Sequence, residues 1–171
     1  MSQATGHAKK GHAAVSAATT PKLNPQTAIT IAVDTQYVAA QQGQNISQGI
    51  YMMDNRVNSG STGEGTLELN THAQDGNLIG FNVVPINPTN GDTVVITGFT
   101  VQPPTGQTGV FGSQGYPEQQ PALGAEPAGG YWIGQATAQG SQTYQIQIEV
   151  TTGGLRPTSY FVNWDPFINS N

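Results

Sequence analysis

The sequence predicts an all-β protein, an antiparallel β-sandwich of jelly-roll type with about eight strands. Three observations favour this class. Glycine and proline, with 22 and 11 residues, are abundant and favour turns. Only 9% of the 171 residues are charged, whereas long surface helices are rich in Glu, Lys and Arg. Short runs of β-branched and aromatic residues recur with alternating polarity, a pattern typical of strands with one face in water.

Strand patterns separated by turn signals recur along most of the chain. Segment 143–150, TYQIQIEV, is the clearest, because its apolar and polar residues alternate strictly. Segment 28–35 is continuously apolar enough to predict burial on both faces. Gly98 inside a strand pattern predicts a β-bulge. The predicted strands are 28–35, 50–54, 66–71, 78–84, 93–101, 131–136, 143–150 and 160–164. Core positions between 67 and 83 are predicted as Leu67, Leu69, Ile79, Phe81 and Val83.

The domain organisation is one sandwich domain, 27–171, after an N-terminal tail, 1–26. The tail is small, polar and interrupted by proline, which predicts disorder, and its His7 and His12 are expected to be solvated rather than a metal site. Segment 36–48 is predicted to be a polar connection with at most a single helical turn, and Asp34 before it to bond to local backbone. The long Gly, Pro and Gln-rich segment 102–130 is expected to be mobile.

Charge limits the classes of partner. The formal net charge is −5, and the predicted domain keeps only Arg56 and Arg156 as cations. Recognition of phosphates needs clustered cations, so neither nucleic acid nor an anionic membrane is expected as a partner. A weakly charged surface offers little repulsion between copies, which favours self-association. No cysteine is present, and no apolar run approaches the ~20 residues that span a bilayer. The expected location is the cytoplasm.

Catalytic signatures are weak. His72 is the only histidine of the predicted domain and therefore the sole candidate base of that type. Ser113 lies in GSQG, which does not match the nucleophile elbow GxSxG. Glu64 and Glu68 could form a carboxylate pair, yet neither has the apolar surroundings that would raise a pKa. We therefore predict no catalytic residue, no metal and no cofactor; a hydrolase is a remote alternative, and a calcium site built from separate loops is left open.

Sugar binding is the activity class that the composition permits best. Asp54, Asn55 and Arg56 at a predicted strand end offer hydrogen-bonding groups, and Trp132 offers an aromatic face for the apolar side of a sugar. The competing interpretation is a local ion pair together with core aromatics. The four residues are the predicted glycan-binding residues.

The order of motifs carries a resemblance to a known family. The motifs run ITIAVDTQYV, GIYMMDNR, GSTGEGTLELN, DGNLIGFNV, GDTVVITGF, YWIGQA, YQIQIEV and FVNWDPFI. In this order the chain resembles the PixA/AidA-type bacterial inclusion body proteins, over residues 27–169. VDTQYV near the start and NWDPFI at the end are the most specific pieces.

The resemblance implies an all-β sandwich that accumulates in the cytoplasm, sometimes as crystalline inclusions. It also implies production tied to stationary phase, quorum sensing or host association, and no catalytic residues. Glycan binding has been considered for some members. The chain departs from the family pattern in its N-terminal tail and in having only three methionines, which does not suit methionine storage. The expectation is a non-enzymatic inclusion body protein that associates with itself, with a glycan-binding module as the alternative.

Overall fold

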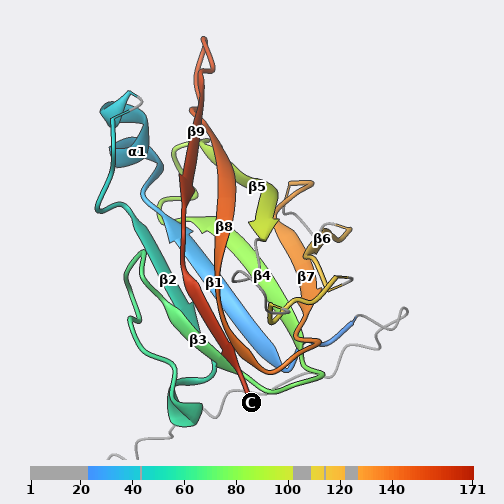
Figure 1. The fold of residues 1–171 in the computed structure, drawn as a ribbon. Helices are drawn as coiled ribbons and strands as arrows, with labels where there is room; N and C mark the ends of the chain where they lie inside the picture. Colours follow the sequence, from blue (N-terminus) through green and yellow to red (C-terminus); the bar gives the residue numbers. More distant parts are fainter. Residues whose placement is uncertain (1–22, 43, 102–108, 114, 122–126) are drawn as a thin grey trace, which may run out of the picture.

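The computed structural model describes residues 23–42, 44–101, 109–113, 115–121 and 127–171, which form two β-sheets packed face to face (Figure 1). The first sheet has the order β2 (Ile50–Asp54), β1 (Thr27–Val33), β4 (Leu78–Pro85), β7 (Tyr131–Gln135) and β6 (Glu118–Gln119). The second has the order β3 (Asn70–Ala73), β10 (Phe167–Ser170), β8 (Gly140–Thr151) and β5 (Thr93–Val101), and β9 (Ser159–Trp164) also pairs with β8. One α-helix, α1 (Thr35–Gln41), follows β1, and a 3-10 turn, η1 (Val57–Ser59), follows β2.

The predicted class, an all-β sandwich, is confirmed, but the sheets are mixed rather than purely antiparallel. Strand β1 runs parallel to β4, with Thr27 opposite Ile79, and β3 runs parallel to β10, with Asn70 opposite Phe167. Alternating polarity indicates on which face of the sheet a side chain lies, but it does not indicate whether the neighbouring strand runs parallel or antiparallel. The prediction of antiparallel pairing throughout was therefore wrong at these two places.

Strand β8 follows the predicted alternation, since its even-numbered residues from Gln142 to Val150 are buried. Strand β1 was predicted to be buried on both faces, and this is wrong: only alternate residues are fully buried. Its outward residues are Ala28, Thr30 and Ala32. Because these side chains are small and at most weakly polar, the segment resembles a continuous apolar run, although the face that they form is partly exposed. The bulge predicted at Gly98 is present, because the register of β5 against β8 shifts between Ile96 and Gly98.

Several element boundaries differ from the prediction. Segment 66–71 is not one strand: Thr66 makes an isolated bridge to Met52, and β3 begins only at Asn70. The connection after β1 contains the seven-residue helix α1 rather than a single turn. Asp34 caps this helix by accepting a hydrogen bond from the backbone N–H of Tyr37 at 3.0 Å, the local backbone role expected for it.

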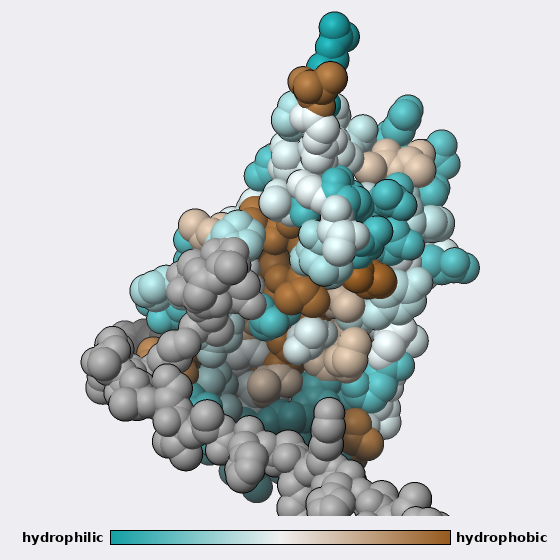
Figure 2. All heavy atoms as spheres, turned by 180° about the vertical axis from the view of Figure 1, so that it is seen from behind, coloured by the Kyte–Doolittle hydropathy of each residue, from teal (hydrophilic) through white to brown (hydrophobic). Residues whose placement is uncertain are grey.

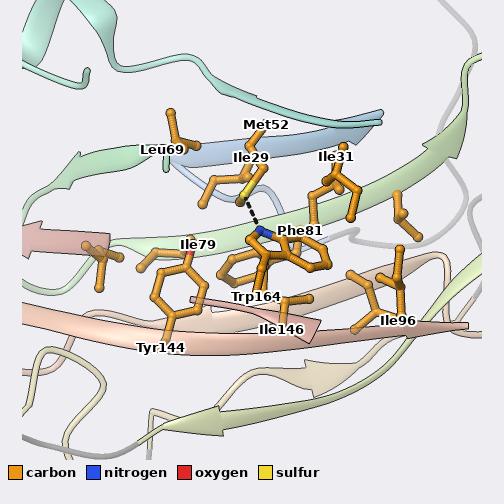
Figure 3. Close-up of a cluster of buried hydrophobic side chains, with 14 of the residues drawn as sticks. Ile29, Ile31, Met52, Leu69, Ile79, Phe81, Ile96, Tyr144, Ile146 and Trp164 are labelled. Atoms are coloured by element: carbon orange, nitrogen blue, oxygen red, sulfur yellow. Dashed lines mark hydrogen bonds between the residues drawn. The ribbon is translucent and has the colours of Figure 1, made fainter. Parts of the chain in front are cut away.

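The core lies between the two sheets and is held by aromatic side chains (Figure 3). The indole N–H of Trp164 donates to the sulfur of Met52 at 3.1 Å, joining β9 to β2. The rings of Phe81 and Phe111 lie 5.8 and 5.6 Å from the ring of Tyr144. Of the five predicted core residues, four are fully buried and Leu67 is partly buried against them.

Phe111 and β6 lie in segment 102–130, which was predicted to be a mobile loop. Phe111 is fully buried, and β6 pairs with β7. Residues 102–108, 114 and 122–126 of that segment lie outside the described residues, as do residues 1–22 of the predicted tail with His7 and His12. The last residues of the predicted tail contact the first sheet, because Gln26 accepts a hydrogen bond from the backbone N–H of Leu78 at 2.8 Å.

Candidate functional site

Of the four predicted glycan-binding residues, Trp132 lies apart from the consecutive Asp54, Asn55 and Arg56. In the register of the first sheet, Asp54 is opposite Ile29, Ile29 is opposite Phe81, and Phe81 is opposite Trp132. Paired residues project to the same face, so Asp54 and Trp132 both point to the inner side of the sheet, with two strands between them. Three strand spacings of about 4.8 Å place their backbones about 14 Å apart.

Asp54 ends β2 with its carboxylate turned toward the interior. One oxygen accepts a hydrogen bond from the backbone N–H of Arg56 at 2.7 Å. The other oxygen is buried and has no hydrogen-bond partner among the described residues. Burial raises the pKa of Tyr144, and the charge of Asp54 raises it further. Partial burial also raises the pKa of Glu64, which accepts a hydrogen bond from the backbone N–H of Asp54 at 3.1 Å.

Asn55 and Arg56 connect strands to one another. Asn55 accepts from the backbone N–H of Ala28 at 2.9 Å and donates to the carbonyl of Gln26 at 3.2 Å, which ties the end of β2 to the start of β1. Arg56 donates from Nε to the carbonyl of His72 at 3.3 Å and from its terminal nitrogen to the side chain of Asn77 at 3.5 Å. These contacts give both side chains a structural role.

Trp132 lies at the rim of the core. Its indole N–H donates to the carbonyl of Gly129 at 3.1 Å, and its ring packs on Phe99 with the ring centres 5.4 Å apart. Its ring thus packs with core aromatics, as the competing interpretation expects. A glycan-binding role for these four residues remains a prediction.

The remaining candidate catalytic residues lie in separate parts of the fold. His72 is half-buried on β3, and its backbone N–H donates to the hydroxyl of Ser61 at 2.9 Å. Ser113 and Glu68 are exposed in separate connections. Within the ranges that the structure describes, no three His, Asp or Glu side chains form a group that could hold a metal ion.

Sequence reasoning missed a hydrogen-bonded centre at Asp92. Its carboxylate accepts from the Thr35 hydroxyl at 2.6 Å, the Asn90 amide at 2.6 Å and the Gly153 backbone N–H at 2.7 Å. Burial works against ionisation, but these three donors together hold the pKa of Asp92 below its ordinary value. Asn90, Gly91 and Asp92 have the composition of an ordinary turn, and nothing local marks the two remote partners. The carboxylate in addition fastens the start of α1 and the β8–β9 turn to the start of β5.

A groove runs between α1 with its following connection and strand β9. Its volume is about 280 Å³. The lining is mixed: one wall has the apolar Val38 and Ile46 beside three polar residues, and the other has four aromatic or aliphatic residues beside one polar residue. The polar lining residues are Gln41, Gln44, Asn45 and Asn163. No sequence signal marks this groove, because its two walls lie more than a hundred residues apart in the chain.

Together these features describe an all-β sandwich protein whose conspicuous polar side chains mostly hold the framework. The chain belongs to the family whose model is described as "Domain of unknown function (DUF8788)", which matches residues 25–156. No curated protein matches the sequence.

The structure is similar to the crystal structure of an inclusion body protein (PixA) from Burkholderia cenocepacia J2315. The TM-score is 0.66 with 13% sequence identity, and the match covers 88% of this chain and 98% of that chain. The likeness to PixA predicted from the motif order is thus supported in the fold, whereas the sequence-level family is a domain of unknown function. In the described part of the chain, no helix is long and apolar enough to cross a membrane.

Proposed function

We propose that this chain is a non-enzymatic protein of inclusion body type, which associates with itself and accumulates in the bacterial cytoplasm. The observation that carries the proposal is the fold match. Nearly the whole of the PixA protein, 98% of its chain, superposes on 88% of this one, so the two share one complete domain rather than a common fragment.

Surface properties support self-association. The chain carries a net charge of only −5 and 9% charged residues, so copies repel one another weakly. Several large apolar side chains reach the surface, including Met53 at 42% and Phe161 at 61% exposure. Seen from behind, hydrophobic residues gather in the middle of the molecule between hydrophilic ones (Figure 2). Such a surface favours contacts between identical molecules.

Size-exclusion chromatography with light scattering over a wide concentration range tests self-association. We expect the mass to rise above the 17.9 kDa of one chain as the concentration increases. A single-chain mass up to about 1 mM would contradict the proposal, because even an association free energy near −4 kcal/mol produces dimers at that concentration.

Accumulation is tested separately in cells. Electron microscopy and fractionation of bacteria that produce the chain should find it in dense cytoplasmic bodies. Fully dispersed protein at high production levels would remove the inclusion body part of the proposal.

A further inference from the structure

Exposed strand edges can pair with another chain, and most edges of the two sheets are covered or interrupted. Along β2, the backbone of Met52 donates to the carbonyl of Thr66 at 3.1 Å and accepts from the N–H of Gly65 at 2.7 Å. Along β3, Thr62 and Asn70 exchange two backbone hydrogen bonds of 3.1 and 2.8 Å. The segment between β2 and β3 therefore covers both edges.

The edge strands β5 and β6, at the other ends of the two sheets, are protected in other ways. Strand β5 is interrupted by the bulge between Ile96 and Gly98, and the N–H of Ile96 donates to the carbonyl of Gly129 at 2.9 Å. Strand β6 has only two residues, too few to template a further strand. Bulges and very short strands are two devices by which β-proteins avoid edge-to-edge pairing.

Strand β9 has none of these protections. It pairs with β8 on one side, and among the described residues no loop backbone bonds to its other side. Its sequence, SYFVNW, contains neither a charged residue nor a proline. Phe161 at its centre is 61% exposed. The tip of the β8–β9 hairpin projects beyond the rest of the molecule (Figure 1). Further along, the groove of about 280 Å³ separates residues 160–164 from α1 and residues 44–46, and no backbone hydrogen bond among the described residues crosses it to β9.

The direction of the backbone groups in β9 follows from its neighbours. The carbonyl of Thr158 accepts from the N–H of Thr152, and the carbonyl of Pro166 accepts from the N–H of Tyr144, so even-numbered residues point their backbone groups toward β8. Alternate residues of a strand point these groups to opposite sides. The N–H and C=O groups of Ser159, Phe161 and Asn163 therefore point away from the sheet.

We propose that β9 pairs antiparallel with β9 of a second copy about a two-fold axis at Phe161; this rests on the proposed self-association and specifies its surface. Phe161 is then opposite the partner's Phe161, and Ser159 is opposite the partner's Asn163. The outward backbone groups of the three residues form about six hydrogen bonds between the copies. Aromatic pairs and polar pairs of this kind stabilise neighbouring antiparallel strands.

Charge and chain geometry select this arrangement over a parallel one. Arg156 precedes β9 and Asp165 follows it, so antiparallel pairing brings the cation of one copy near the anion of the other. A parallel pairing would place like charges together. Pro157 and Pro166 flank the strand and cannot extend the ladder. The same surface is used on both copies, so the association closes as a dimer.

A single introduced cysteine tests the register, because the chain contains none. Hydrogen-bonded residues opposite each other have Cα atoms about 5.5 Å apart, within the range that a disulfide spans. Under mild oxidation, Phe161→Cys should form a covalent dimer at least ten times faster than Leu155→Cys. Leu155 is 105% exposed at the tip of the same hairpin and lies outside the pairing, so it controls for accessibility.

A charge introduced at the β9 edge tests the interface without forming a covalent bond. Phe161→Lys should weaken dimerisation at least tenfold in sedimentation velocity, whereas Phe167→Lys, on the outer face of the internal strand β10, should leave it unchanged. Circular dichroism and thermal unfolding confirm that both variants fold. If the wild-type chain associates but neither the cysteine nor the lysine at 161 differs from its control, the β9 interface is wrong and the proposed function stands. A wild-type chain that stays single at all concentrations overturns both.

Discussion

The carboxylate of Asp92 is a polar group whose removal should destabilise the fold. It receives three hydrogen bonds, from Thr35, Asn90 and Gly153, all between 2.6 and 2.7 Å. Two of these partners lie 57 and 61 residues away along the chain. Asp92→Ala removes all three bonds at once and releases three connections from one another.

The expected loss follows from the number and kind of the bonds. A hydrogen bond to a charged group contributes about 1.5–3 kcal/mol when fully buried. Asp92 is only half-buried and water can reach the released donors, so we expect a total near 2–3 kcal/mol. For a domain of this size that lowers Tm by about 5–10 °C. Asp92→Asn keeps the size and one oxygen acceptor and should cost about 1 kcal/mol.

Urea and thermal unfolding, followed by the fluorescence of the two tryptophans Trp132 and Trp164, measure these losses. Asp75→Asn, in an exposed turn, is the matched control and should change the free energy of unfolding by less than about 0.5 kcal/mol. A double-mutant cycle of Thr35→Val with Asp92→Ala should give a coupling energy of about 1 kcal/mol. If Asp92→Ala is no more damaging than the Asp75 control, the carboxylate does not hold these connections.

The pH dependence gives an independent check. The folded pKa of Asp92 is below its ordinary value, so its stabilisation is present in full above the unfolded pKa of about 3.8. It is lost as the pH falls through the lower folded pKa. The advantage of the wild-type chain over Asp92→Asn should therefore be constant at neutral pH and shrink only in the acid range. An advantage that persists below the folded pKa would refute the role of the charge.

Four further outcomes are expected. Tyr144→Phe should raise stability by about 1 kcal/mol, because the buried hydroxyl lacks a partner among the described residues; a clear loss in urea unfolding would contradict this. Glu64→Gln should be more stable than the wild-type chain at pH 7 but not at pH 3. The pKa of Glu64 is raised in the folded state, so its stabilisation is present below the unfolded pKa and is lost as the pH rises through the folded pKa. Equal stabilities of the two chains at both pH values would speak against this. Phe111→Ala should cost about 3–5 kcal/mol, and a loss below 1 kcal/mol would show that this ring is not part of the core. On a glycan array, the glycan hypothesis expects binding by the wild-type chain that Arg56→Ala or Trp132→Ala reduces, and a wild-type chain without binding, with and without calcium, would end this hypothesis.

The sequence predicted elements well where local pattern decides the structure. Strands β2 and β5 coincide with their predicted bounds, and the alternation in β8 identified its buried face. Strand β10 was missed because Pro166 reads as the end of a strand, although the chain resumes pairing one residue later. Phe111 was missed because an isolated aromatic in a Gly and Pro-rich segment has no periodicity, and its burial depends on contacts distant in sequence.

The roles of polar residues could likewise be predicted where their partners are local, but not where the partners are remote in sequence. The local cap at Asp34 could be predicted from its place after a strand. Asp92 could not be recognised as a centre, because its residues already satisfy a turn pattern and the important partners are remote. Trp132 and Asp54 were grouped by chemical suitability, and sequence order gave no indication that two strands separate them.

The parallel pairing of β3 with β10 has a consequence for how the chain folds. Asn70 and Asn169, which hydrogen bond across these strands, are 99 residues apart, and Trp164 reaches Met52 over 112 residues. Contacts this remote require large loops to close before they return any stabilisation, which slows folding to the range of milliseconds to seconds. Until β9 and β10 dock, β8 presents an open edge and a bare apolar face. A chain produced quickly at high concentration can therefore meet its neighbours before it closes on itself, so its final physical state depends on the rate of synthesis as well as on the stability of the fold.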